Sequence, residues 1–177
     1  MNGGRSGARF AFLAGIYFAL LQTGYFWGLA VYMTSAYQGF ATVTVAWLAG
    51  SGLGLFAGRF TGSPVFTNRW FWAPAGLGAF YLSMALLRTH PFDLSLIWAH
   101  GSMVAISGAG AGVFFADNRN LFQKTARLFY HENNGFVLGW LVGFAGFVFG
   151  GFAFSWLAPA AIAAIVTPMS VKIQRHS

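Results

Sequence analysis

The chain has 177 residues, of which 57% are hydrophobic and only 7% are charged. A soluble domain of this size carries about 25% charged residues, so the composition argues against a soluble protein and predicts a membrane protein. The formal net charge is +7, but the ten basic residues lie scattered in short gaps between apolar runs, which argues against a nucleic-acid partner. The chain has no cysteine, and this excludes disulfides, thiolate metal sites and cysteine nucleophiles.

Five apolar segments have close to the ~20 residues needed to cross ~30 Å of hydrocarbon. They are Phe10–Met33, Gly39–Gly58, Trp70–Leu87, Leu94–Ala116 and Gly135–Trp156. A sixth, Ala158–Val171, is shorter; Pro159 suits a helix start, whereas Pro168 would kink or end the helix. We predict an all-α, polytopic membrane helix bundle of six transmembrane helices, with five as the alternative if the sixth segment only packs against the bundle. The first segment is too long and too weakly flanked to be a cleaved signal peptide.

The basic residues predict the orientation of this bundle. With six helices, nine of the ten fall on one side of the membrane, and Arg88 alone falls on the other. Lys and Arg are enriched in cytoplasmic loops, so both termini are expected to be cytoplasmic, whereas five helices would place Lys172 and Arg175 outside. The expected organisation has three parts: a cytoplasmic tail over 1–9, a transmembrane domain over 10–171 and a cytoplasmic tail over 172–177.

The first segment carries a polar pair, Gln22 and Thr23, near mid-membrane. Polar side chains at this depth commonly hydrogen-bond a neighbouring helix, and we favour that role over a substrate site.

Glycines recur every four residues in "AGSGLGLFAGRF", which ends the second segment. In water each glycine would cost the helix roughly 1 kcal/mol against alanine, but in lipid the helix is required because every backbone N–H and C=O needs an internal partner. A face of glycines then lets another helix approach closely. Two sets of glycines are predicted to form helix-packing surfaces: Gly50, Gly54 and Gly58 in the second segment, and Gly139, Gly143 and Gly150 in the fifth.

His100 lies one to two turns inside the fourth segment. Ionisable groups inside a membrane are costly and often functional, so His100 is a candidate contact for a haem, chlorophyll or quinone. The alternative is a neutral histidine that hydrogen-bonds a neighbouring helix. No two histidines are spaced three or four residues apart, so the sequence predicts no metal site.

The longest polar stretch, 117–134, is expected to be a cytoplasmic amphipathic connector. Its apolar residues would face lipid or the bundle, and "HENNG" would end the helix in a turn before the fifth segment. Arg119, Lys124 and Arg127 would bind anionic headgroups or an acidic partner. The alternative is a solvated connector with no partner.

Two stretches resemble the membrane region found in front of some bacterial spermidine-synthase-like proteins. "SAYQGFATVTVAWLAGSGLGLFAGRF" resembles the second helix of that region, with its Ala-Tyr start and its glycine run closing on Gly-Arg. "ARLFYHENNGFVLGWLVGFAGFVFGGF" is similar to the fifth helix, with matching positions at Arg127, Tyr130, Asn133, Gly139 and Gly143. That region in turn resembles half of a major-facilitator transporter, and the resemblance implies six helices in a bacterial inner membrane.

The chain departs from that family in two ways. The fourth helix has "SGAGAGVFFAD" where the family usually shows a proline-containing run, and the soluble aminopropyltransferase domain is absent from this sequence. No glycine-rich loop after a strand and no paired carboxylates offer a site for an amine substrate. The resemblance therefore does not imply polyamine synthesis, and we expect no enzymatic activity.

The expected function is that of an accessory or scaffold subunit, which packs through its glycine-rich faces within a larger membrane protein complex. Its partners would be membrane lipids and other transmembrane subunits. One alternative is a half-transporter that acts as a dimer. The other is a cofactor-binding subunit of an electron-transfer or photosynthetic complex, which rests on His100 and the many aromatic residues.

Overall fold

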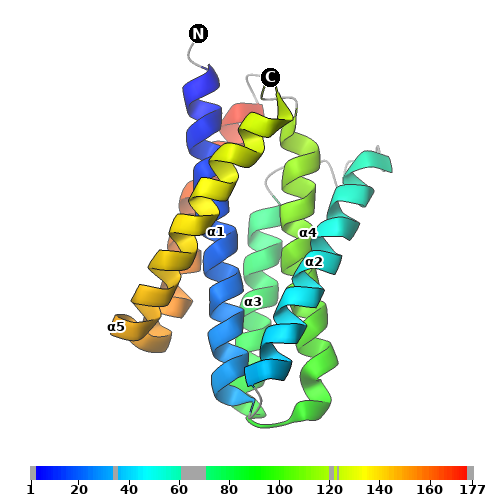
Figure 1. Ribbon diagram of the computed structural model, residues 1–177, viewed down its shortest axis with the longest axis vertical. Coiled ribbons are helices and arrows are strands. Elements are labelled where there is room, and N and C mark those ends of the chain that lie inside the picture. The colour runs from blue at the N-terminus through cyan, green and yellow to red at the C-terminus, as the bar shows by residue number, and fades with distance from the viewer. Residues whose placement is uncertain (1–2, 34–35, 61–70, 120–121, 123, 175–177) are drawn as a thin grey trace.

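The computed structural model describes residues 3–33, 36–60, 71–119, 122 and 124–174. They form α1 (Gly3–Tyr32), α2 (Ala36–Phe60), α3 (Trp72–Thr89), the short 3-10 helix η1 (Leu94–Leu96), α4 (Ile97–Asn118) and α5 (Thr125–Gln174), as Figure 1 shows. No strand occurs among these residues, so the all-α prediction is confirmed for this part of the chain.

Among the described residues, four stretches are long and apolar enough to cross a membrane: Ser6–Tyr32, Tyr37–Gly58, Leu94–Asn118 and Thr125–Ser170. Their helices run alongside one another over most of the length of the molecule (Figure 1). This arrangement is compatible with a helical membrane bundle. The expected segment Trp70–Leu87 corresponds to α3, which is not among the four. Trp70, the first residue of that segment, lies outside the described part of the chain.

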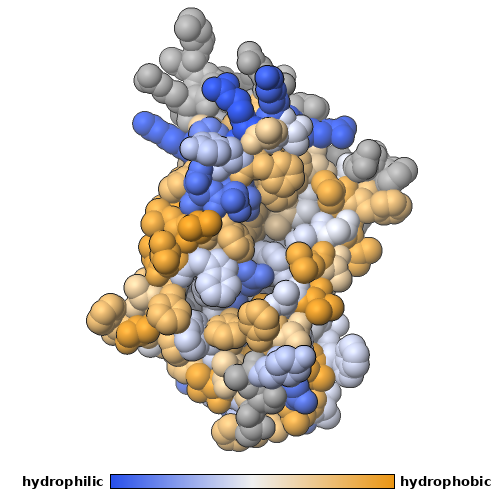
Figure 2. All heavy atoms as spheres, in the orientation of Figure 1, coloured by the Kyte–Doolittle hydropathy of each residue, from blue (hydrophilic) through white to orange (hydrophobic). Residues whose placement is uncertain are grey.

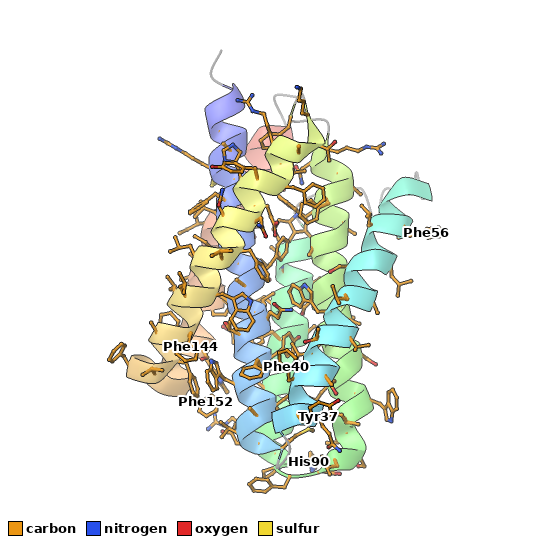
Figure 3. The ribbon with its side chains drawn as sticks, in the orientation of Figure 1. Tyr37, Phe40, Phe56, His90, Phe144 and Phe152 are labelled. Atoms are coloured by element: carbon orange, nitrogen blue, oxygen red, sulfur yellow. The ribbon has the colours of Figure 1, made fainter. Side chains whose placement is uncertain are left out.

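The boundary between the fifth and sixth expected segments lies at Gly151 and not between Trp156 and Ala158, where the sequence placed it. α5 breaks at Gly151, whose φ of 58° and ψ of −147° are not helical, and the two legs of α5, 125–150 and 152–174, form a hairpin. Only glycine adopts such a φ without steric cost, which explains why the turn falls here rather than after Trp156. The second leg ends beside the N-terminal end of α1, and Phe144 and Phe152 mark the turn of the hairpin (Figures 1 and 3).

The two prolines of the sixth segment do not bound a helix. Pro159 lies eight residues past Gly151 rather than at a helix start, and the helix continues beyond Pro168 to Gln174. Prolines are tolerated inside transmembrane helices because neighbouring groups satisfy the carbonyls that they leave without a donor.

The connector over 117–134 is not a separate amphipathic helix. α4 continues to Asn118 and α5 begins at Thr125, so "HENNG" forms helix rather than a turn. Leu128 and Glu132 are buried, and Gly135 lies against the backbone of Phe12 in α1. This packing keeps the turn-forming residues helical, since tertiary contacts override local propensity.

An aromatic cluster fills the space between α1, the start of α3 and the last turns of α4. Phe18 of α1 lies 5.2 Å from Trp72 of α3 and 5.6 Å from Phe114 of α4, measured between ring centroids. Phe10 and Tyr17 extend the cluster, and all five side chains are buried. Tilted and edge-on aromatic pairs of this kind contribute about 0.5–1.5 kcal/mol each beyond their buried area. These side chains therefore pack the space between the three helices.

Candidate functional site

The glycines of α2 bring that helix into backbone contact with α4. A Cβ atom at Gly50 would overlap the carbonyl of Ala105, and one at Gly54 would overlap the carbonyl of Ala109. Gly58 lies at the same interface, where a Cβ would be 2.5 Å from the methyl group of Ala116. All three glycines predicted to pack in the second segment thus face the same partner helix.

α4 contributes glycines of its own to this contact. A Cβ at Gly108 would lie 2.5 Å from the carbonyl oxygen of Trp47, and one at Gly112 would overlap the carbonyl of Ser51. The Ser51 hydroxyl also donates to the carbonyl of Gly108 at 3.1 Å. Gly108 and Gly112 were not predicted to pack, although their four-residue spacing within "SGAGAG" is the same signal as that of Gly50, Gly54 and Gly58.

The second set of glycines packs α5 on α1. Gly139 lies against the backbone of Ile16, and Gly143 lies against the side chain of Thr23. Gly135 of α5 and Gly15 of α1 belong to the same contact and were not predicted. Gly150 does not belong to it, because the atoms that a Cβ there would meet within 4 Å are those of Phe154, in the second leg of α5.

His100 is completely buried between α4 and α3. Its Nδ1 atom and the Ser83 hydroxyl of α3 form a hydrogen bond of 2.8 Å. Nε2 has no hydrogen-bond partner among the described residues. The imidazole thus ties two helices together through one nitrogen, and His100 lines neither of the hollows described below.

Several other buried polar groups of this region are hydrogen-bonded between helices. The Tyr25 hydroxyl lies 2.9 Å from the Ser107 hydroxyl, which in turn donates to the carbonyl of Gly76 at 2.9 Å. The Tyr17 hydroxyl donates to the carbonyl of Ala73. These bonds join α1 and α4 to α3, so the polar residues between these helices act as interhelical contacts.

Three exposed cations mark one end of the bundle. Arg119 follows α4, and Lys124 and Arg127 lie at the start of α5, and all three are exposed. Figure 2 shows hydrophilic side chains gathered at this end, above the apolar flanks. Glu132 lies two turns into α5 and is only 8% exposed. Its burial was not predicted, because the stretch around it reads as a polar connector.

No group of three or more His, Asp or Glu side chains that could hold a metal ion occurs in the described part of the chain.

Gln22 and Trp140 form a hydrogen-bonded pair between α1 and α5. The indole Nε1 of Trp140 donates to Oε1 of Gln22 at 3.1 Å. Trp140 also lines a shallow hollow of about 480 Å³, together with Phe136, Val137, Leu141 and Phe144. Figure 2 shows hydrophilic atoms at the floor of a recess about halfway along this face, with apolar side chains around it.

A second hollow, of about 710 Å³, lies where the first halves of α2 and α4 diverge. Tyr37, Ala41 and Val45 line it from α2, and Trp98 and Gly101 line it from α4. Its walls are mainly apolar.

None of the protein-family models, curated proteins or solved structures compared with this chain matches it. The resemblance to the membrane region of spermidine-synthase-like proteins therefore stays a prediction.

Proposed function

We propose that this protein is an integral membrane accessory subunit, which packs through its apolar outer faces against other transmembrane subunits of a larger complex. The observation that carries this proposal is that the inner and outer surfaces of the helices differ in composition. Glycine contacts and paired polar groups are used within the chain, whereas large apolar side chains remain exposed on the outside. Apolar faces of this extent are covered by lipid or by protein partners.

The outer faces of α2 and α5 carry many of these side chains. Leu53 and Phe56 of α2 are exposed, and Phe56 points away from the bundle in Figure 3. Leu141, Phe149 and Leu157 of α5 are exposed as well, and Phe149 is 91% exposed. Both long faces are therefore available to neighbouring helices.

The proposed topology has six membrane crossings: α1, α2, α3, α4 and the two legs of α5. The N-terminal end of α1 and the C-terminal end of α5 lie at the same end of the bundle (Figure 1), which supports an even number of crossings. The start of α5, next to Lys124 and Arg127, lies at that end too (Figure 1), which favours a cytoplasmic location for both termini in a bacterial inner membrane. Reporter fusions at Ser177 and at Asn120 test this, and a periplasmic signal at Ser177 alone would exclude it.

Transport is the second candidate, and Glu132 is the observation in its favour. A carboxyl group buried in a transmembrane helix often belongs to an ion or proton pathway. However, Glu132 lies near one end of α5, and it lines neither of the two hollows. Substrate sites of secondary transporters lie near the midplane, so the accessory role is the better supported of the two.

Purification from the native membrane in mild detergent, followed by mass determination and an absorption spectrum, tests the proposal. We expect a colourless assembly that contains other proteins. A lone colourless dimer would instead favour a half-transporter. A bound chromophore would favour a cofactor-binding role for His100.

A further inference from the structure

The side-chain amide of Gln22 has an oxygen that accepts a hydrogen bond and an NH₂ group that has no hydrogen-bond partner among the described residues. The indole N–H of Trp140 can only donate, so the amide oxygen of Gln22 must face it and the amide NH₂ group must point away. That NH₂ group donates no hydrogen bond to a described residue, while Gln22 itself is partly exposed. Two N–H donors therefore face the surroundings of the bundle beside Trp140.

These donors lie deep in the hydrocarbon region. Gln22 is sixteen residues from Ser6 and ten from Tyr32, the two ends of the apolar stretch of α1. At 1.5 Å per residue, the nearer end is about 15 Å away. The acceptors of a phospholipid lie at the edges of the ~30 Å hydrocarbon core, so a lipid cannot bond the amide at this depth. An amide donor without a partner in hydrocarbon is costly.

We infer that a transmembrane helix of another subunit packs on the face of α5 that carries the hollow beside Trp140, and that this helix presents a hydrogen-bond acceptor to the neighbouring Gln22 amide. The acceptor would be the side-chain oxygen of an Asn, Gln, Ser or Thr at mid-membrane. This inference rests on the accessory role proposed above and names the surface through which that role is carried out.

The shape of the surroundings suits a helix rather than a small polar molecule. The hollow is lined by apolar side chains of α5, among them Val137 and Leu141, which are largely exposed. These side chains would contact the apolar side chains of a packed helix, and Gln22, bonded to Trp140 at the edge of this face, would be met by one polar residue of that helix. The same pair of donors would fix the register of that helix, because a shift of one turn would move its acceptor about 5.4 Å away.

Photo-crosslinking in the native membrane tests the inference directly. A photoreactive residue at Leu141 probes the hollow, and one at Leu53 of α2, which is similarly exposed at 67% against 64%, is the matched reference position. We expect the Leu141 probe to capture one discrete protein other than this chain. Capture of lipid alone, or of a second copy of this chain, would overturn the inference.

Gln22→Met removes the donors and keeps a side chain of similar length. We expect the Leu141 crosslink to fall by about three- to twentyfold, the range set by hydrogen bonds between membrane helices, while the yield at Leu53 stays the same. Ser102→Ala is the control variant, because the exposed Ser102 hydroxyl is bonded within α4 to the carbonyl of Trp98. An unchanged Leu141 crosslink in Gln22→Met would overturn the inference.

The stability of the isolated chain in detergent separates this effect from misfolding. Gln22→Met removes the unsatisfied donors but also takes the acceptor from the Trp140 indole N–H, so we expect a moderate fall in the thermal midpoint of the isolated protein. A variant that still unfolds in one cooperative transition is folded, and the crosslink comparison then holds. If the wild-type protein purifies alone, the accessory role itself fails. If the wild type copurifies with other proteins and Gln22→Met binds them equally well, only the role of Gln22 fails.

Discussion

Gly54 of α2 and Ala109 of α4 lie backbone against backbone, so closely that a Cβ atom on Gly54 would overlap the Ala109 carbonyl. Gly50 and Ala105 repeat this contact one turn away, and Gly108 and Gly112 repeat it from the α4 side. Both helices therefore contribute glycines to the contact, and each lets the backbone of the other approach closely. Helices that approach this closely gain dispersion contacts along their backbones, and such contacts are the main source of association in lipid.

Replacement of Gly54 by leucine should break this contact. A leucine there requires the two helices to separate, and overpacking of a tight contact typically costs about 1–3 kcal/mol. We expect Gly54→Leu to lower the thermal midpoint of the detergent-solubilised protein. Gly52→Leu is the matched control in the same helix, because nothing lies within 4 Å of a Cβ at that position. Equal midpoints for the two variants would show that α2 and α4 do not pack through this face.

The hairpin of α5 should depend on Gly151 for a different reason. Its Cβ would meet no atom within 4 Å, but its φ of 58° is a conformation that other residues adopt only at a cost of about 1–3 kcal/mol. We therefore expect Gly151→Ala to lower the thermal midpoint through backbone strain alone. Gly78→Ala, which also has open space around its Cβ but lies within α3, should be neutral or stabilising. If Gly151→Ala instead leaves the thermal midpoint unchanged or raises it, as expected for Gly78→Ala, the hairpin does not turn at Gly151.

The Ser83–His100 pair should show strong coupling in a double-mutant cycle. Ser83→Ala leaves Nδ1 of the buried His100 without its partner, and an unsatisfied buried group costs about 1–3 kcal/mol. His100→Leu should have a smaller effect in the Ser83→Ala background than in the wild type, because loss of both polar groups leaves nothing unsatisfied. Thermal unfolding of the four proteins measures this coupling. Additive effects would mean that the two side chains do not interact.

The exposed cations at the start of α5 should bind anionic lipid. Each basic residue near a negatively charged membrane surface contributes about 1 kcal/mol at low salt. We expect the double variant Lys124→Gln with Arg127→Gln to retain less phosphatidylglycerol when purified from mixed-lipid membranes. The difference from wild type should shrink at high salt, since screening weakens the attraction. Equal lipid retention at both salt concentrations would assign these side chains to solvent.

The sequence by itself determined that the protein is built of long apolar helices. A charged fraction of 7% and apolar segments about twenty residues long predict helices in lipid, because a bilayer leaves the backbone few other ways to satisfy its hydrogen bonds. The four-residue spacing of Gly50, Gly54 and Gly58 also marked a helix-packing face, since both the spacing and the absence of side chains are local properties. These features need no knowledge of what lies opposite.

Only the tertiary structure decided which surfaces meet. The partner of the α2 glycines is α4, with its own Gly108 and Gly112, and the turn in α5 falls at Gly151 rather than between Trp156 and Ala158. Glu132 is buried because α1 packs over it, although its neighbours in the sequence are polar and turn-forming. The Gln22 amide is oriented by Trp140, which lies 118 positions away along the chain. Each of these outcomes depends on a contact between distant segments, and the free energy of such contacts is not encoded in the local periodicity from which the helices were predicted.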